Sequence, residues 1–311
     1  MSHSPTMQAF VLAEAGAQAI ELADVPVPSI DADELLVRVR AVGGGIHDSY
    51  FLPADTVYPY PIGIEAAGVV EQVGMGITGF RPGDRIAFVS SMQAKGGTWA
   101  QFVAVKAGAL ILPMPEGLDF ARAASVPVAG TTILKAFRAL DSGEDKTVFI
   151  AGGSGAIGTL GLQIARSRGW RMAASASATN LEYMASLGAE LTVDYRDPAW
   201  RERILAWAPG GVDAAIAIQP GTSADSLPVV RDGGQLVSIS GDPLATARGI
   251  RMTGLPYAED VQAETVLLLR DIVAGRVHVE LEHVFPFEQA PAALAKVQTR
   301  RARGKVVLTL K

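Results

Sequence analysis

The strongest chemical signal in the sequence is a run of glycines near the middle of the chain. Six residues fit the pattern G-x-G-x-x-G: Gly153, Ser154, Gly155, Ala156, Ile157 and Gly158. In such a loop the first glycine permits a tight turn, the second lets a pyrophosphate reach the backbone, and the third allows close helix–strand packing. The pattern therefore predicts a dinucleotide-binding loop. The alternative is a glycine-rich turn that only connects a strand to a helix.

The segments around the glycines have the character that such a loop requires. Residues 148–151 form an apolar strand and residues 156–168 a helical segment, whose N–H groups and dipole would face the phosphates. This alternation of strand and helix continues along the chain and is typical of an α/β domain with a parallel, doubly wound sheet. Further strands are expected at 171–175, 191–194, 212–218, 235–240 and 250–253, and helices at 180–187 and 260–274.

The end of the second strand indicates which dinucleotide binds. NAD sites usually place Asp or Glu there to hold the ribose 2′-OH. The chain instead has Ser175, Ala176 and Ser177, and Glu182 comes a full turn later. Because a carboxylate would repel a 2′-phosphate, its absence favours NADPH as the cofactor. NADH remains the alternative, since no arginine or lysine stands at this position to bind the phosphate.

Residues 7–118 follow a different pattern, that of short strands separated by turns. Residues 35–42 alternate apolar with basic side chains, as a half-exposed strand does, and further strands are expected at 68–73 and 85–89. After residue 276 we expect a strand at 277–281, a helix at 288–301 and a strand at 306–310. With 311 residues the chain is long enough for two domains, so a compact β-rich domain accompanies the parallel sheet.

Composition excludes several classes of protein. The chain is 49% hydrophobic and 19% charged, with 27 basic against 32 acidic residues and a net charge of −5, so no basic field for nucleic acid is expected. It has no cysteine, which excludes disulfides, thiolate metal sites and cysteine nucleophiles and is compatible with the cytosol. The first ten residues lack the pattern of a secretory signal. Residues 147–165 carry no charge, but their five glycines favour strand–turn–helix over a membrane span.

Several motifs together resemble those of a known family, the medium-chain dehydrogenase/reductases, in their zinc-free quinone-oxidoreductase (zeta-crystallin-like) branch. The resemblance covers nearly the whole chain. Residues 61–70 look like P-x-G-x-[DE]-x-A-G-V-V and residues 79–85 resemble the F-x-x-G-D-R-V turn. Residues 151–158 stand at the cofactor loop, residues 187–195 resemble L-G-A-D…I-D-Y, and residues 302–308 look like the closing A-x-G-K-V-V-L strand.

This resemblance implies a GroES-like substrate domain at 1–122, a Rossmann domain for NADPH at 123–275, and a return segment at 276–311 that completes the first domain. It implies hydride transfer to a quinone or an α,β-unsaturated carbonyl in a cleft between the domains. It also implies a homodimer that binds a small apolar substrate. From the composition we expect a cytoplasmic protein that binds neither nucleic acid nor membrane.

Departures from the family pattern affect the metal and the active-site loop. Zinc-dependent relatives have a cysteine where this chain has Gly45 and a histidine where it has Ile64, so no metal site is expected. The family's N-P-x-D-x-Y run is here residues 45–50, and glycine replaces its asparagine. Leu181 stands where some relatives carry a lysine for the 2′-phosphate. The resemblance also implies that Tyr195 matches a tyrosine that lines the 2′-phosphate pocket in such relatives.

Three residues are candidates for catalysis. Tyr50 matches the family's active-site tyrosine and either orients the substrate carbonyl or only forms the pocket wall. His47 is either an acid or base at neutral pH or a bystander, and Asp48 is expected to hold the loop through backbone hydrogen bonds. Thr132 matches a threonine near the nicotinamide, with helix capping as the alternative. Besides the glycine loop, the predicted cofactor-binding residues are Ser175, Ser177, Tyr195, Ser240, Arg303 and Lys305.

The aromatic and histidine residues outside this motif have structural interpretations. Phe51, Tyr58, Tyr60 and Trp99 could line an apolar slot, although core positions are expected, and His278 and His283 are expected on a solvated face. Two other functions remain open. One is an enoyl-thioester or polyketide-type reductase on the same scaffold. The other is a weakly catalytic, dinucleotide-binding sensor or structural protein.

Overall fold

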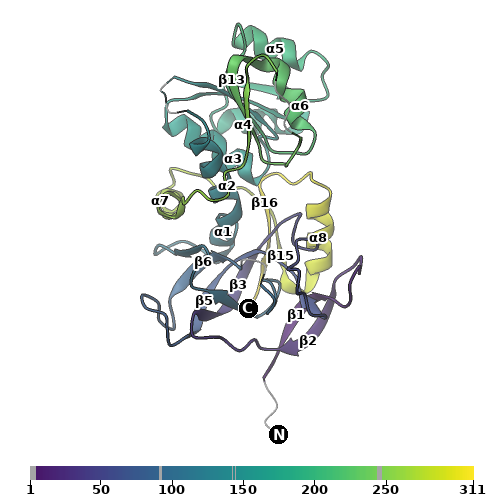
Figure 1. Ribbon diagram of the computed structural model, residues 1–311, viewed down its shortest axis with the longest axis vertical. Coiled ribbons are helices and arrows are strands. Elements are labelled where there is room, and N and C mark those ends of the chain that lie inside the picture. The colour runs from purple at the N-terminus through teal and green to yellow at the C-terminus, as the bar shows by residue number, and fades with distance from the viewer. Residues whose placement is uncertain (1–4, 91–92, 142, 144, 244–246) are drawn as a thin grey trace. The chain divides into compact units, whose positions relative to one another are not determined.

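The chain forms two compact units, which the computed structural model describes except for residues 1–4, 91–92, 142, 144 and 244–246 (Figure 1). The first unit comprises residues 1–128, 265–276 and 281–311, and the second comprises residues 129–264 and 277–280. The first boundary thus lies at residue 128 where we expected 122. Residues 265–275, which we expected in the Rossmann domain, group with the first unit.

The first unit is built mainly from strands, as its pattern predicts. Three antiparallel strands form a small sheet in the order β2-β1-β4. Its members are β1 (Thr6–Leu12), β2 (Glu21–Pro26) and β4 (Tyr60–Pro61). The larger sheet has the order β15-β16-β3-β5-β6-β8, and β7 pairs with β3. Its members are β3 (Glu34–Gly44), β5 (Glu65–Val73), β6 (Arg85–Val89), β7 (Phe102–Lys106), β8 (Ile111–Pro113), β15 (Leu281–Pro286) and β16 (Lys305–Thr309).

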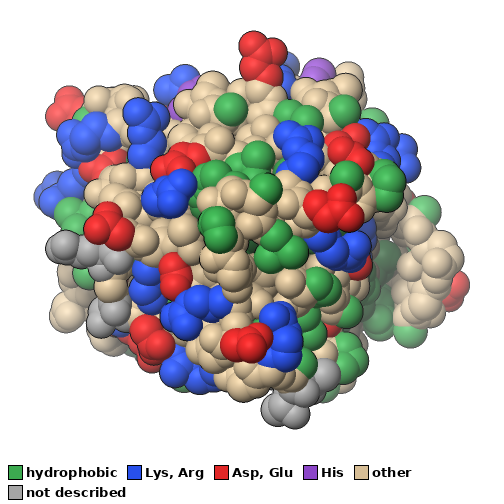
Figure 2. All heavy atoms as spheres, turned by 90° about the horizontal axis from the view of Figure 1, so that it is seen from above, with side chains coloured by type: hydrophobic (Ala, Val, Ile, Leu, Met, Phe, Trp, Pro, Cys, Tyr) green, Lys and Arg blue, Asp and Glu red, His purple; other side chains and the backbone are tan. Residues whose placement is uncertain are grey.

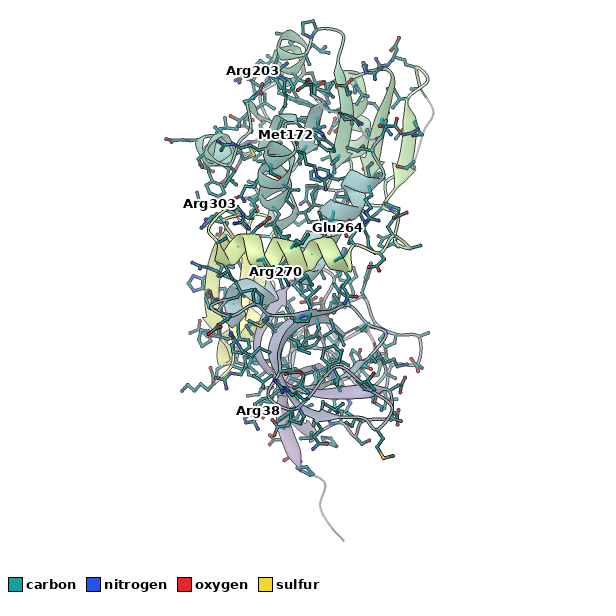
Figure 3. All side chains as sticks on the ribbon, turned by 90° about the vertical axis from the view of Figure 1, so that its left-hand side faces the viewer. Arg38, Met172, Arg203, Glu264, Arg270 and Arg303 are labelled. Atoms are coloured by element: carbon teal, nitrogen blue, oxygen red, sulfur yellow. The ribbon has the colours of Figure 1, made fainter. Side chains whose placement is uncertain are left out.

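Distant parts of the sequence share the core of this unit. The last strand, β16, pairs antiparallel with β3, so that Val307 lies opposite Gly43. Phe88 and Trp99 from the amino-terminal half pack in one apolar cluster with Leu294 from the carboxyl-terminal segment. The return segment therefore completes this core, as the resemblance implies. The helices of the unit are α1 (Phe120–Ala124), α8 (Ala290–Gln298) and most of α7 (Gln262–Val273), which carries both Glu264 and Arg270 (Figure 3).

The second unit contains the predicted doubly wound parallel sheet. All five strand pairs are parallel, and the order is β11-β10-β9-β12-β13-β14. The order reverses between β9 and β12, and ligands of open α/β sheets bind at such a switch point. The strands are β9 (Thr147–Ala151), β10 (Arg171–Ala176), β11 (Leu191–Asp194), β12 (Val212–Ala217), β13 (Val230–Ser238) and β14 (Arg251–Gly254). The helices are α2 (Pro127–Arg138), α3 (Ala156–Ser167), α4 (Leu181–Ser186), α5 (Trp200–Trp207) and α6 (Thr222–Ser226).

The prediction of a strand at 277–281 is wrong. The regular strand is β15, which begins at Leu281 and pairs with β16. The backbone of His278 is instead held by one side chain, since its N–H donates to Gln163 Oε1 at 2.7 Å and its carbonyl accepts from Gln163 Nε2 at 2.9 Å. The side-chain amide of Gln163 on α3 thus makes the two backbone hydrogen bonds that a neighbouring strand would otherwise make with His278. His278 and His283 are exposed, as expected.

Charges of both signs are mixed over the surface. Figure 2 shows lysine and arginine side chains scattered among acidic ones on the face that it presents, with no single basic field. In the second unit Arg201 pairs with Asp225 and Arg231 with Asp213, so the basic groups are locally neutralised. Across the described part of the chain, no helix combines the length and the apolar character needed to cross a membrane.

Candidate active site

The glycine loop connects β9 to α3 at the switch point of the parallel sheet. The chain turns at Gly152, whose φ of +92° is in the region that favours glycine. The N–H groups of Gly152 and Gly153 both donate to the carbonyl of Ser175, at 3.2 and 2.9 Å. The loop is therefore tied to the end of the neighbouring strand β10.

The three motif glycines differ in the space around them. A Cβ on Gly153 would lie 2.8 Å from both Ala174 Cβ and Met184 Sδ, and one on Gly158 would lie 2.6 Å from the carbonyl oxygen of Gly152. A Cβ on Gly155 would meet no atom nearer than 3.8 Å. The first and third glycines are therefore required by packing inside the protein, whereas the second borders open space. This arrangement fits a pyrophosphate that approaches the backbone at Gly155.

The amino terminus of α3 is suited to hold an anion. Gly155 is its N-cap, no side chain caps the helix, and no acidic residue lies in the first turn. The first N–H groups of a helix lack intrahelical partners and carry the positive end of the dipole. Ser154, Ala156 and Ile157 are half-buried in this turn. The loop can therefore bind phosphate through backbone groups alone.

The end of β10 brings three predicted cofactor residues to one edge of the sheet. Ser175 is buried, and Ser177 Oγ lies 3.2 Å from Thr179 Oγ1 and accepts a hydrogen bond from Asn180 Nδ2 at 3.1 Å. The N–H of Tyr195, just beyond β11, donates to the carbonyl of Ala176 at 3.3 Å, and its side chain is exposed. Ser175, Ser177 and Tyr195 thus cluster beside the glycine loop.

An ion pair beside this cluster was not among the sequence predictions. Asp194, the last residue of β11, binds Arg196 through Nε at 3.1 Å and Nη2 at 3.0 Å. Because Ala176 pairs with Asp194 across the strands, this pair lies next to the end of β10. A signal was present in the sequence, since Arg196 directly follows the tyrosine of the I-D-Y motif. Only the register of β10 against β11 places it beside Ser177.

The remaining predicted cofactor residues lie in different places. Ser240 follows β13 at the carboxyl edge of the parallel sheet, with Oγ 3.4 Å from Ser238 Oγ. Arg303 belongs to the first unit, where its N–H donates to Glu282 at 2.8 Å. Lys305 is buried in the same unit and forms an ion pair with Glu65. The second oxygen of Glu65 accepts from the N–H of Val128, at the start of α2.

The candidate catalytic residues His47 and Tyr50 lie together in the loop after β3. The backbone N–H of Tyr50 donates to the carbonyl of His47 at 3.1 Å, and the two rings meet edge to face with centroids 5.3 Å apart. The His47 ring stacks on Phe51 at 4.3 Å. Tyr50 is 52% exposed, so its phenol is accessible to a substrate. Burial, with Arg300 and Lys305 nearby, lowers the pKa of His47, which keeps the imidazole neutral at pH 7.

The structure also shows where Thr132 and the remaining aromatic residues lie. Thr132 lies inside α2 and is buried, so the alternative that it caps the helix is wrong. Tyr60 and Trp99 are fully buried core residues, as expected for this small domain, whereas Phe51 is 48% exposed.

Asp48 holds the loop, as the sequence predicts. Its Oδ2 accepts from the Gly45 N–H and from Trp99 Nε1, each at 2.9 Å. Burial is the largest cause that raises its pKa from 3.8 to about 7, against the lowering effect of these hydrogen bonds. A Cβ on residue 45 would lie 3.1 Å from Asp48 Oδ1. Glycine at the family's asparagine position therefore lets this carboxyl group approach the backbone closely.

We expect Asp48→Asn to become relatively more stable than the wild type as the pH rises. The raised pKa means that the folded state binds the proton more tightly, so the contribution of Asp48 to stability falls between about pH 4 and pH 7. Asparagine has the same shape and keeps the acceptor at the Oδ2 position. The difference in the free energy of unfolding should shift towards the variant by on the order of 2 to 3 kcal/mol between pH 5 and pH 8. Urea unfolding at both pH values measures it, and a difference independent of pH contradicts the assignment.

Comparison with known proteins shows which family the chain belongs to. Residues 31–116 match the family described as "Alcohol dehydrogenase GroES-like domain", and residues 187–308 match "Zinc-binding dehydrogenase". The chain superimposes on the quinone oxidoreductase from Coxiella burnetii with a TM-score of 0.87 and 24% identity, over 99% of this chain and 100% of the other. The chain belongs to the medium-chain dehydrogenase/reductase superfamily. The first unit is accordingly its GroES-like domain and the second its Rossmann-like domain.

Relatives within the superfamily are oxidoreductases. The chain is 28% identical to the "NADPH-dependent alkenal/one oxidoreductase, chloroplastic" of Arabidopsis thaliana, over 97% of this chain and 79% of the relative. It is also 28% identical to a quinone oxidoreductase of Pseudomonas aeruginosa, over 94% and 96% of the two chains. This chain is therefore an oxidoreductase with a dinucleotide-binding domain.

The metal positions of this dehydrogenase/reductase agree with the zinc-free branch. Gly45 and Ile64 stand where zinc-dependent relatives have ligands, and the sequence contains no cysteine. Within the residues that the structure describes, no three His, Asp or Glu side chains converge in a group able to hold a metal ion.

Proposed function

We propose that this protein is a zinc-independent, NADPH-dependent oxidoreductase that reduces a quinone or an α,β-unsaturated carbonyl compound by hydride transfer. The observation that carries the proposal is the glycine loop at the switch point, where Gly155 borders open space between two tightly packed glycines. The names of the alkenal/one oxidoreductase and quinone oxidoreductase relatives support the choice of substrate.

The Rossmann-like domain would hold the cofactor. Backbone groups at Gly155 and the start of α3 bind the pyrophosphate, and Ser177 and Tyr195 border the adenosine ribose. Ser175, Ser240, Arg303 and Lys305 remain predicted cofactor residues, although the ammonium group of Lys305 is already paired with Glu65. When bound, the reduced nicotinamide supplies a hydride to an electron-poor carbon.

The loop around Tyr50 would serve the substrate. As the carbonyl oxygen gains negative charge it needs hydrogen-bond donors, and the exposed phenol of Tyr50 can donate. Thr132 is a second proposed donor. His47 is mostly neutral at pH 7, so beside Tyr50 it can accept a proton or donate an N–H hydrogen bond. Gly45 and Ile64 cannot act as the zinc ligands that lower the pKa of an alcohol in zinc-dependent relatives, which favours a quinone or an enone over alcohol oxidation.

The experiment that tests the function is a steady-state assay with NADPH and either 9,10-phenanthrenequinone or a short 2-alkenal. Turnover of either compound with the purified protein supports the proposal. Tight NADPH binding without turnover of either substrate supports a dinucleotide-binding sensor instead. Turnover restricted to enoyl thioesters supports the polyketide-type reductase. The homodimer remains a prediction from the resemblance, and the cytoplasmic location remains a prediction from the composition.

We expect NADPH to bind at least about tenfold more tightly than NADH, which corresponds to about 1.4 kcal/mol. The end of β10 has no carboxylate to repel a 2′-phosphate, and Ser177 is a small polar residue there. Ser177→Asp should reverse the preference towards NADH, because a carboxylate there bonds a 2′-OH and repels phosphate. Fluorescence titration of both cofactors measures the ratio. Equal affinities for the wild type would contradict the predicted preference.

Zinc should be absent and unnecessary. Elemental analysis of the purified protein should find no stoichiometric zinc, and EDTA should leave the rate unchanged, because neither Gly45 nor Ile64 can ligate a metal. Tightly bound zinc that turnover requires would remove the chain from the zinc-free branch.

A further inference from the structure

The geometry points to Arg196 as the residue that selects NADPH by binding its 2′-phosphate. This inference rests on the proposed NADPH dependence and assigns the cation that the sequence pattern lacks. Neither Arg nor Lys follows β10 directly, and Leu181 stands at the position where some relatives have lysine. The fold brings Arg196 to the same edge from the neighbouring strand.

Arg196 is held at this edge by three contacts with Asp194. Asp194 Oδ1 accepts from the backbone N–H of Arg196 at 3.0 Å and from Nε at 3.1 Å, and Oδ2 accepts from Nη2 at 3.0 Å. Asp194 also accepts from the N–H of Ala178, the residue after Ser177, and these contacts lower its pKa, with the Arg196 side chain the largest cause. The carboxylate is therefore ionised at neutral pH and fixes the guanidinium beside the Ser177 turn.

The contact leaves part of the guanidinium available for a phosphate. Asp194 uses Nε and Nη2, so Nη1 and the outer hydrogen of Nη2 point away from it. The Arg196 side chain is 58% exposed and its Cζ lies 5.7 Å from the centre of the Tyr195 ring. A guanidinium with two free N–H directions binds a phosphate in a forked geometry that lysine cannot reproduce.

Asp197, three residues after Asp194, has its own partner. Asp197 lies 4.0 Å from Arg203, which Figure 3 labels on α5. Asp194 is neutralised by Arg196 itself. A 2′-phosphate therefore meets a paired carboxylate and a forked donor here. A ribose 2′-OH carries no charge and would accept only a single hydrogen bond from the guanidinium.

The test measures affinity for NADPH, NADH, 2′,5′-ADP and 5′-AMP by calorimetry or fluorescence with the whole protein. Arg196→Gln should weaken NADPH and 2′,5′-ADP by at least about tenfold, the loss typical of a charge-assisted hydrogen bond, and change NADH and 5′-AMP by less than about twofold. Arg196→Lys should recover part of the loss. The wild-type preference should also shrink as salt rises.

Arg171→Gln is the matched control. Arg171 forms a similar ion pair, with Glu190 at 2.9 Å, but lies at the opposite end of β10. The Arg171→Gln variant should therefore bind all four ligands with the wild-type affinities. If Arg196→Gln keeps the wild-type preference, or weakens all four ligands equally, the assignment of Arg196 is wrong while the proposed function stands. If the wild type itself does not distinguish 2′,5′-ADP from 5′-AMP, the NADPH preference and the role of Arg196 both fail.

Discussion

Gly155→Val should weaken NADPH binding by roughly 100-fold, about 2.8 kcal/mol, while the protein stays folded. The backbone at Gly155 has φ −79° and ψ 175°, which valine adopts freely, and a Cβ there meets nothing within 3.8 Å. The side chain would instead occupy the space through which the pyrophosphate reaches the start of α3. Loss of one or two charge-assisted hydrogen bonds accounts for this magnitude. Valine is a poorer N-cap than glycine, so a loss of stability of about 1 kcal/mol is expected as well.

Gly158→Ala is the contrasting variant. Its Cβ would lie 2.6 Å from the Gly152 carbonyl oxygen and from Gly153 Cα, both backbone atoms. Overpacking of this kind should lower the free energy of unfolding by about 1 to 3 kcal/mol. Thermal unfolding without cofactor, measured beside cofactor titration, separates the two effects. Normal NADPH affinity in folded Gly155→Val would mean that the pyrophosphate does not bind at this loop.

Tyr50→Phe should lower kcat on an enone by roughly 10- to 100-fold. The change removes only the hydroxyl group, and a missing oxyanion donor typically costs about 100-fold or more, which water in an accessible site partly restores. Quinone reduction should suffer less, because aromatisation stabilises the product anion. NADPH affinity should not change, since Tyr50 belongs to the loop after β3 and not to the Rossmann-like domain.

The control for this variant is Tyr257→Phe, which removes an exposed phenol in the other unit and should leave kcat unchanged. Steady-state kinetics on both substrate types decide the role of Tyr50. Full kcat on the enone and the quinone would make the phenol a pocket wall only. The proton would then come from water or from the minor fraction of His47 that is protonated at pH 7.

Local patterns predicted most of the regular elements. Strands β6 and β11 coincide with residues 85–89 and 191–194, and α3 ends one residue before the predicted end, at Ser167. The predictions of these elements are correct because each element is determined locally, by one buried face or by the glycine loop. The strand expected at 277–281 fails because two contacts with Gln163, more than a hundred residues earlier, fix the backbone of His278.

Residue type and local spacing predicted the dinucleotide loop and excluded thiolate ligands, whereas Tyr50 became a candidate only through the resemblance to the family. Tertiary structure alone decided what surrounds them. Strand register brought Arg196 beside Ser177, and burial raised the pKa of Asp48 to about 7. Packing also enclosed Lys305 with Glu65, which lies 240 positions away in the chain. Such contacts depend on which distant segments become neighbours, and desolvation and pairing arise only after they do.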